Sequence, residues 1–176
     1  MKLDGKKVLM VIPHTQFRDE EFFEPKKILE DAGAKVVVAS TSVRPCHGMK
    51  GGLAQPDISI ADAKADDYAA LVICGGSSVP GFFWNDKKLQ EIVTAMHAAG
   101  KVVAAICLST VVIARAKLLT DREATVYFLP EAIHQLKEGG ARYVKDTLII
   151  HNNIILAEGP PDSERFGQAV RAALAS

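Results

Sequence analysis

The sequence lacks several features that mark specialised classes of protein. It has only three cysteines among 176 residues, Cys46, Cys74 and Cys107. None belongs to a C-x-x-C pair or stands beside histidines at zinc spacing, so we expect no disulfide framework, no metal site and no cofactor. Lys plus Arg and Asp plus Glu both number 21. This balance leaves no excess charge to attract nucleic acid or an anionic membrane, and we expect neither as a partner.

Long apolar runs are missing as well. No stretch approaches the roughly 20 apolar residues that a membrane-spanning helix needs. The first residues, Met1 to Asp4, lead directly into the apolar run Val8 to Ile12 without a signal-peptide pattern. The sequence therefore predicts a cytoplasmic protein in a reducing compartment. Because 48% of the residues are hydrophobic, we expect residues 1–176 to form a single domain with its own core.

Short apolar runs alternate with helical patterns along the chain. Four runs are typical of buried parallel strands: residues 7–12, 36–39, 70–74 and 102–106. Helices are predicted at residues 20–32, after a cap at 84–86, and at 108–117, 130–137 and 163–174. Residues 147–151 and 154–157 flank Asn152-Asn153, which favours a tight hairpin. The pattern predicts an α/β fold, a flavodoxin-like doubly wound three-layer α/β/α sandwich whose mostly parallel sheet has a C-terminal antiparallel hairpin.

Cys107 stands at a corner between a strand and a helix, in the stretch V-V-A-A-I-C-L-S-T-V-V-I-A of residues 102–114. Ligands of a doubly wound sheet bind beyond the carboxyl ends of its strands, where this corner lies. The unpaired N–H groups of the first helical turn favour a thiolate there, so we expect the pKa of Cys107 to be lowered. The alternative is that Cys107 is one more small buried hydrophobe, as most free cysteines are.

Three segments in this order resemble the ThiJ/PfpI (DJ-one) superfamily, a class I glutamine amidotransferase-like group. A-A-I-C at residues 104–107 resembles its nucleophile elbow. F-R-D-E-E-F-F-E-P-K-K-I-L-E-D-A-G at residues 17–33 resembles its first loop and helix, with Glu21 four residues before Pro25. L-V-I-C-G-G at residues 71–76 resembles its third strand and diglycine. The resemblance extends from about Lys6 to the last predicted helix.

The resemblance implies roles for particular residues. Cys107 and Glu21 would be the catalytic pair, and the backbone N–H groups of Gly75, Gly76 and Leu108 would stabilise an oxyanion. A protonated Glu21 could donate a hydrogen bond to the thiolate, since burial and a nearby negative sulfur both raise a carboxyl pKa. The alternative for Glu21 is a solvated helix face, which its spacing to the proline disfavours. By the same analogy we expect a homodimer.

The sequence departs from the superfamily where a histidine is expected. Members that hydrolyse peptides or act on dicarbonyls should carry one directly after the cysteine or in the loop after the next strand. Leu108 fills the first place, and residues 125–130, T-V-Y-F-L-P, fill the second. The usual Cys-His arrangement is therefore absent, which argues against protease activity. We predict His14, which follows the first strand, as the substitute base; the alternative is a loop histidine bonded to water or backbone.

A second cysteine could take part in redox chemistry. Cys74 and Cys107 end two neighbouring strands of the predicted sheet. Adjacent strands lie about 4.8 Å apart, within the Cα range of a disulfide. A sulfenic acid on Cys107 could therefore be captured by Cys74, giving a reversible switch.

Three functions are open at this point. The first is an enzyme that acts on a small reactive carbonyl through a Cys107 thiohemiacetal, in the manner of a glyoxalase, deglycase or hydrolase. The second is a stress-related redox sensor whose Cys107 is oxidised by peroxide. The third is a binding or regulatory module that keeps the pocket, with the aromatic residues 82–84 closing over a ligand. The missing histidine favours the sensor over the enzyme.

Overall fold

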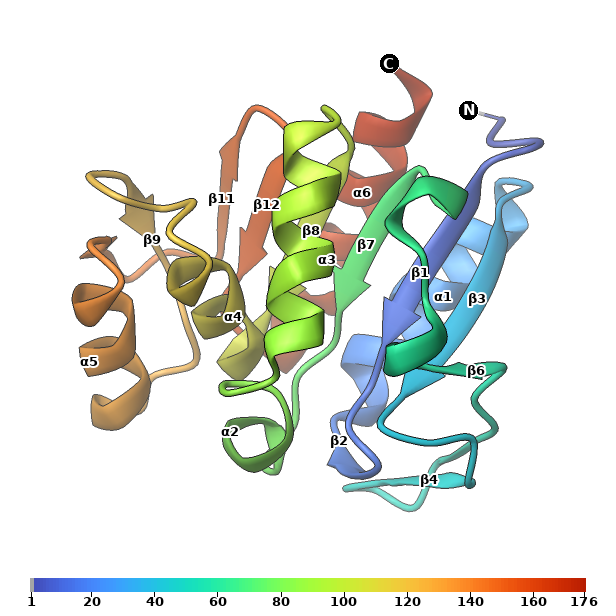
Figure 1. Cartoon of the computed structure of the whole chain (residues 1–176), viewed down its shortest axis with the longest axis horizontal. Helices are drawn as coiled ribbons and strands as arrows, with labels where there is room; N and C mark the ends of the chain where they lie inside the picture. Colours follow the sequence, from blue (N-terminus) through green and yellow to red (C-terminus); the bar gives the residue numbers. More distant parts are fainter. Residues whose placement is uncertain (1) are drawn as a thin grey trace.

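A seven-stranded sheet forms the centre of the protein, whose computed structural model describes residues 2–176. The order across the sheet is β11, β12, β8, β7, β1, β3, β6 (Figure 1). The bounds are β1 (Lys7–Val11), β3 (Lys35–Ser40), β6 (Ile58–Ser59), β7 (Ala70–Ile73), β8 (Val102–Ile106), β11 (Leu148–His151) and β12 (Ile154–Ala157). β11 pairs antiparallel with β12, and every other neighbouring pair is parallel. The predicted doubly wound sheet with a C-terminal hairpin is confirmed.

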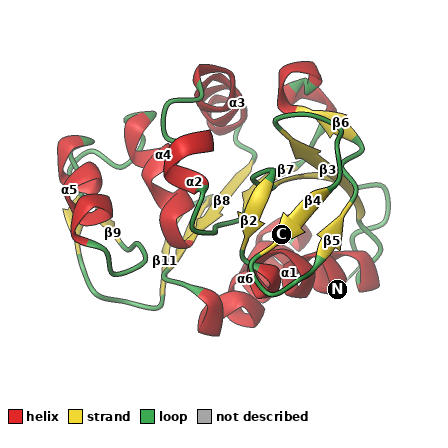
Figure 2. Ribbon diagram, turned by 90° about the horizontal axis from the view of Figure 1, so that it is seen from below, coloured by secondary structure: helices red, strands yellow, loops and turns green. Residues whose placement is uncertain are grey.

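Helices cover both faces of the sheet, as Figures 1 and 2 show. On one face lie α1 (Asp19–Asp31) and α6 (Ser163–Ala175). On the other lie α3 (Lys87–Ala98) and α4 (Thr110–Arg115), with α5 (Pro130–Glu138) packed against α4. Gly167 lets α1 and α6 approach closely, because a Cβ there would lie 3.0 Å from the Cα of Pro25. The three layers α/β/α follow from this packing.

Burial explains why the central strands have continuous apolar sequences. Every residue of β7 and of β8 is buried, as expected for parallel strands covered on both faces. The hairpin turn uses Asn152 at φ 54°, a left-handed conformation that asparagine tolerates. The predicted cap of α3 is formed by Asp86, whose carboxylate accepts the Leu89 N–H at 3.0 Å.

Several small elements were not predicted. β2 (Thr15–Phe17), β4 (Cys46–Gly48) and β5 (Leu53–Ala54) form a three-stranded sheet, and β9 (Glu123–Ala124) pairs with β10 (Arg142–Tyr143). A short helix, α2 (Val79–Phe82), precedes α3. The predicted helix 108–117 is shorter than expected, because a 3₁₀ turn (Cys107–Ser109) precedes α4. The other 3₁₀ turns are Ile60–Asp62, Ala65–Asp67 and Pro160–Asp162. Among residues 2–176, none of the helices combines the length and the apolar character that crossing a bilayer requires.

Candidate active site at the Cys107 elbow

Cys107 follows β8 at a sharp corner of the backbone. Its φ is 64°, in the left-handed region that non-glycine residues seldom adopt. Such a conformation costs about 1–3 kcal/mol and persists only where the surroundings enforce it. Two buried hydrogen bonds hold this corner: Ser109 Oγ donates to the carbonyl of Cys74 at 2.7 Å, and Trp84 Nε1 donates to the carbonyl of Leu108 at 2.9 Å. The predicted elbow is therefore present.

Glu21 reaches the elbow from the first turn of α1. The backbone fixes this approach, because the N–H of Arg18 donates to the carbonyl of Gly75 at 2.9 Å. A Cβ on Gly75 would lie 2.3 Å from Oε1 of Glu21 and 2.6 Å from Cβ of Cys107. Both side chains therefore rest against the same glycine, and only a glycine leaves room for the pair. Glu21 is fully buried, which rules out the alternative of a solvated helix face.

The environment of Glu21 favours its protonated form. Burial raises the pKa of this carboxyl from 4.5 to about 8, although the nearby Cys107 thiol and the Gly75 amide act in the opposite direction. Neither carboxyl oxygen has a hydrogen-bond partner of normal geometry within residues 2–176, so the cost of burying a charge there is not compensated. At neutral pH the carboxyl therefore holds its proton.

The expectation of a lowered pKa for Cys107 was wrong. Burial raises the pKa of this thiol well above 9.0, and a negative charge on Glu21 raises it further. The backbone N–H groups of Leu108 and Gly76 act on the sulfur in the opposite direction but do not reverse the shift. The helix behind the elbow explains the difference, because α4 has six residues and begins only after a 3₁₀ turn. A short helix end cannot offset the burial of a side chain that is 5% exposed.

The two groups form one coupled acid pair. Ionisation of either Cys107 or Glu21 disfavours ionisation of the other, so the pair carries at most one negative charge over the neutral range. Its first proton leaves near pH 8, where Glu21 ionises. The amides of Leu108 and Gly76 face the sulfur, so the remaining proton can sit on the carboxyl while the charge sits on sulfur. The reactive form of the pair is the one with a thiolate on Cys107 and a proton on Glu21.

The elbow opens onto a small cavity of about 270 Å³. It lies beyond the carboxyl ends of β7 and β8, the predicted edge of the sheet. The lining residues are Arg18, Met49, Gly76, Ser77, Pro80, Cys107, Leu108, Tyr127, Leu129 and Pro160. A larger hollow of about 610 Å³ lies at the opposite edge, around Lys7, Gly100 and Asn153. It contains no part of the elbow.

His14 does not line the cavity at the elbow. Its backbone carbonyl accepts the His47 N–H at 3.2 Å, where β2 pairs with β4. Because of this unpredicted pairing, the backbone of His14 lies against the small sheet formed by β2, β4 and β5. The structure therefore does not place His14 beside Cys107, and the cavity has no histidine among the residues that the structure describes.

Cys74 directly follows β7 and lies next to the elbow, as the strand order predicts, since β7 and β8 are neighbours. Its side chain is fully buried, and burial together with the charge of Glu21 raises the pKa of its thiol. All three cysteines are free. Its proposed role as a redox partner stays a prediction, and capture of an oxidised Cys107 requires a local movement of this buried thiol.

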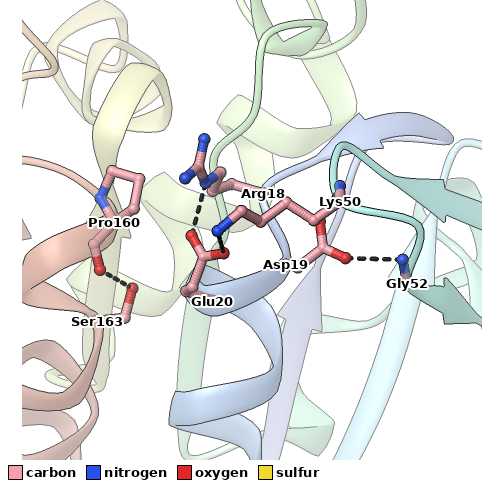
Figure 3. A network of polar contacts seen from close by, with 7 residues as sticks. All are labelled: Arg18, Asp19, Glu20, Lys50, Gly52, Pro160 and Ser163. Carbon is pink, nitrogen blue, oxygen red and sulfur yellow. Dashed lines mark hydrogen bonds and ion pairs between the residues drawn. The ribbon is translucent and has the colours of Figure 1, made fainter.

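The mouth of the cavity carries a charge network that sequence reasoning missed. Glu20 lies between two cations: its Oε2 is 2.6 Å from Arg18 Nε and its Oε1 is 3.2 Å from Lys50 Nζ (Figure 3). Asp19 fixes the neighbouring turn by accepting the N–H groups of Lys50 and Gly52, both at 2.8 Å. The sequence places three of these residues in one run but gives no sign that Lys50 returns to them. No group of three or more metal-ligating side chains occurs within residues 2–176.

Comparison with known proteins assigns the chain to a family. The DJ-1/PfpI family profile matches residues 6–173. The chain belongs to the DJ-1/PfpI family. Its fold also matches a solved ThiJ/PfpI domain protein from Brachyspira murdochii with a TM-score of 0.90 and 32% identity, over 97% of this chain and 98% of that one. The superfamily resemblance of the sequence motifs is thereby confirmed.

Relatives within the DJ-1/PfpI family give little functional detail. An uncharacterized protein of Methanocaldococcus jannaschii, MJ0967, is 45% identical over 172 residues, 98% of this chain and 84% of that protein. A Bacillus subtilis protein named putative cysteine protease YraA is 31% identical over 164 residues, 92% of this chain and 95% of that protein. Function must therefore be argued from the site itself.

Proposed function

We propose that this DJ-1/PfpI-family protein captures small reactive carbonyl compounds on Cys107 as part of a stress response. The observation that carries the proposal is the buried pair of Cys107 and Glu21, held at a strained elbow and open to a cavity of about 270 Å³. Ligand pockets commonly measure about 300–1,000 Å³. The cavity therefore suits a molecule of a few heavy atoms rather than a peptide.

The first step follows from the singly ionised pair. The sulfur of Cys107 attacks the carbonyl carbon, a C–S bond forms, and the π electrons move to oxygen. The N–H groups of Gly76 and Leu108 stabilise the oxyanion, which then takes the proton from Glu21. The product is a neutral thiohemiacetal beside a carboxylate, so charge and protons balance.

Glu21 supplies the base that the missing histidine would otherwise provide. Its new carboxylate can remove the proton from the carbon that bears sulfur when the substrate is a dicarbonyl, which gives an enediol. Return of that proton to the neighbouring carbon gives a thioester, and water releases a 2-hydroxy acid. Protease activity is not proposed, because a cavity of about 270 Å³ is too small for a peptide chain.

Methylglyoxal turnover tests the proposal. Wild type should convert methylglyoxal to lactate, and Cys107→Ser should abolish that conversion. Cys46→Ser is the matched control, because Cys46 is also buried but lies in β4 outside the cavity. Lactate formation that survives in Cys107→Ser would refute a thiohemiacetal on this sulfur.

A redox role is the second candidate, and one observation favours it. The amides of Gly76 and Leu108 face the sulfur, which would stabilise a sulfinate as well as an oxyanion. Mass spectrometry after mild peroxide should then find Cys107 oxidised without turnover of any carbonyl. A linked peptide joining Cys74 and Cys107 under non-reducing conditions supports the switch. Accumulation of Cys107 sulfinate without that peptide excludes Cys74 as the partner.

A homodimer is part of the same proposal. Exposed apolar side chains gather where α1 meets the small sheet: Phe23 is 40% exposed, Met49 41% and Leu53 63%. Phe23 contacts this sheet closely, since a Cβ on Gly52 would lie 2.7 Å from its ring. Such a patch is typical of a protein interface. Light scattering should give twice the mass of one chain, and Leu53→Lys should lower it.

A further inference from the structure

One charged side chain lines the cavity at the elbow, and it belongs to Arg18. Its backbone is tied to the diglycine loop, because its N–H donates to the carbonyl of Gly75 at 2.9 Å. The hydrogen bond with Glu20 is the main cause of the raised pKa of Arg18, and a negative charge on Cys107 contributes a little in the same direction. Arg18 and Cys107 therefore border the same small space.

The guanidinium of Arg18 has N–H donors that are not used within the described chain. Only its Nε is engaged within the described chain, by Glu20 at 2.6 Å. Figure 3 draws one contact from this guanidinium, the one between Nε and Glu20. A guanidinium has five N–H donors arranged to meet a carboxylate in two parallel hydrogen bonds. The terminal nitrogens can make such contacts without breaking the bond to Glu20.

Of the four charged side chains in this network, Arg18 is the one that lines the cavity. Glu20 is shared between Arg18 and Lys50, so these three side chains carry a net charge of +1. Asp19 is turned to the amides of Lys50 and Gly52. Glu21 is protonated at neutral pH, since its pKa is about 8. With Asp19 the four side chains sum to zero, so an anion is favoured where it meets the terminal nitrogens of Arg18 directly.

We infer that Arg18 selects carbonyl compounds that carry a carboxylate, by holding the carboxylate at the cavity mouth while the carbonyl carbon meets Cys107. This inference rests on the proposed function and names its substrate class. A cavity of about 270 Å³ restricts that class to short oxo acids and aldehyde acids. The remaining lining residues are neutral, so Arg18 is the group that distinguishes an anionic carbonyl from a neutral one of the same size.

Two matched probes test the inference. Methylglyoxal and glyoxylate have the same number of heavy atoms, but only glyoxylate carries a charge. The apparent dissociation constant of each is obtained from its protection of Cys107 against iodoacetamide. The ratio of the two constants is the readout, because any change in thiol reactivity affects both compounds equally. Arg18→Gln should reduce the preference for glyoxylate by about tenfold, which is the effect of one partly exposed charge-assisted hydrogen bond.

Controls separate this inference from the proposed function. Arg44→Gln removes an exposed arginine outside the cavity and should leave the ratio unchanged. Glycolate has a carboxylate but no carbonyl, so its binding to Cys107→Ser, followed by NMR, reports the Arg18 subsite without any chemistry. That binding should be lost when Arg18→Gln is added. If it persists, or if the ratio is the same in wild type and Arg18→Gln, the inference is overturned. If glycolate binds through Arg18 but neither carbonyl protects Cys107, the subsite stands and the proposed function fails.

Discussion

Replacing Glu21 with glutamine tests the energetic basis of the elbow, because the amide keeps the shape of the side chain but cannot ionise. The folded protein raises the pKa of Glu21 from 4.5 to about 8. Between these values the folded state keeps a proton that the unfolded state has lost. Stability from this group is therefore complete below pH 4.5 and declines as pH rises toward 8, at about 1.4 kcal/mol per pH unit. The total is at most about 5 kcal/mol.

The assay is urea denaturation at pH 5, 6, 7 and 8 for wild type and Glu21→Gln. The free energy of unfolding of wild type minus that of the variant cancels every other titrating group, and it should fall by several kcal/mol from pH 5 to pH 8. Glu91→Gln is the matched control, since Glu91 is exposed on helix α3; its difference from wild type should stay nearly flat. A flat difference for Glu21→Gln would refute the assignment of a buried, protonated carboxyl.

Two further variants test how the elbow is assembled. Gly75→Ala should destabilise the protein by about 1–3 kcal/mol and change the alkylation rate of Cys107, because its Cβ would overlap Glu21 Oε1. Gly81→Ala is the control, since a Cβ there meets open space, and it should change neither quantity. Equal urea midpoints for the two variants would contradict the close packing around Gly75. Trp84→Phe should cost about 1–3 kcal/mol of unfolding free energy, because it leaves a buried carbonyl without its 2.9 Å donor; an unchanged midpoint would show that this bond contributes nothing.

The main strands could be predicted from sequence because burial on both faces leaves a continuous apolar run. β8 begins and ends where its run begins and ends. The three-stranded sheet around β4 could not be predicted, since its strands have two or three residues and one exposed side. Pairing with a distant segment, rather than local pattern, defines strands of that length.

The parts of the site that lie in sequence motifs could be predicted. The spacing from Glu21 to Pro25 and the A-A-I-C motif identified a carboxyl and a thiol that the fold brings against one glycine. The pKa direction of Cys107 was wrong, because sequence shows a helix start but neither its shortness nor the depth of burial. His14 was expected beside Cys107 but does not line the cavity, because nothing in the sequence indicates that β2 pairs with β4. Arg18 was not predicted as a site residue, because only the fold shows that it lines the cavity at Cys107.

The alkylation of Cys107 by iodoacetamide as a function of pH is the most direct test of the coupled pair. In wild type the rate should rise up to about pH 8 and then flatten, because Glu21 loses its proton there and its charge raises the pKa of Cys107. In Glu21→Gln no charge arises beside the thiol, so the rate should follow that of wild type below about pH 8 and continue to rise above it. A Glu21→Gln protein whose rate flattens above pH 8 as in wild type would contradict the account, because Glu21 would then not be the coupled neighbour of the thiol.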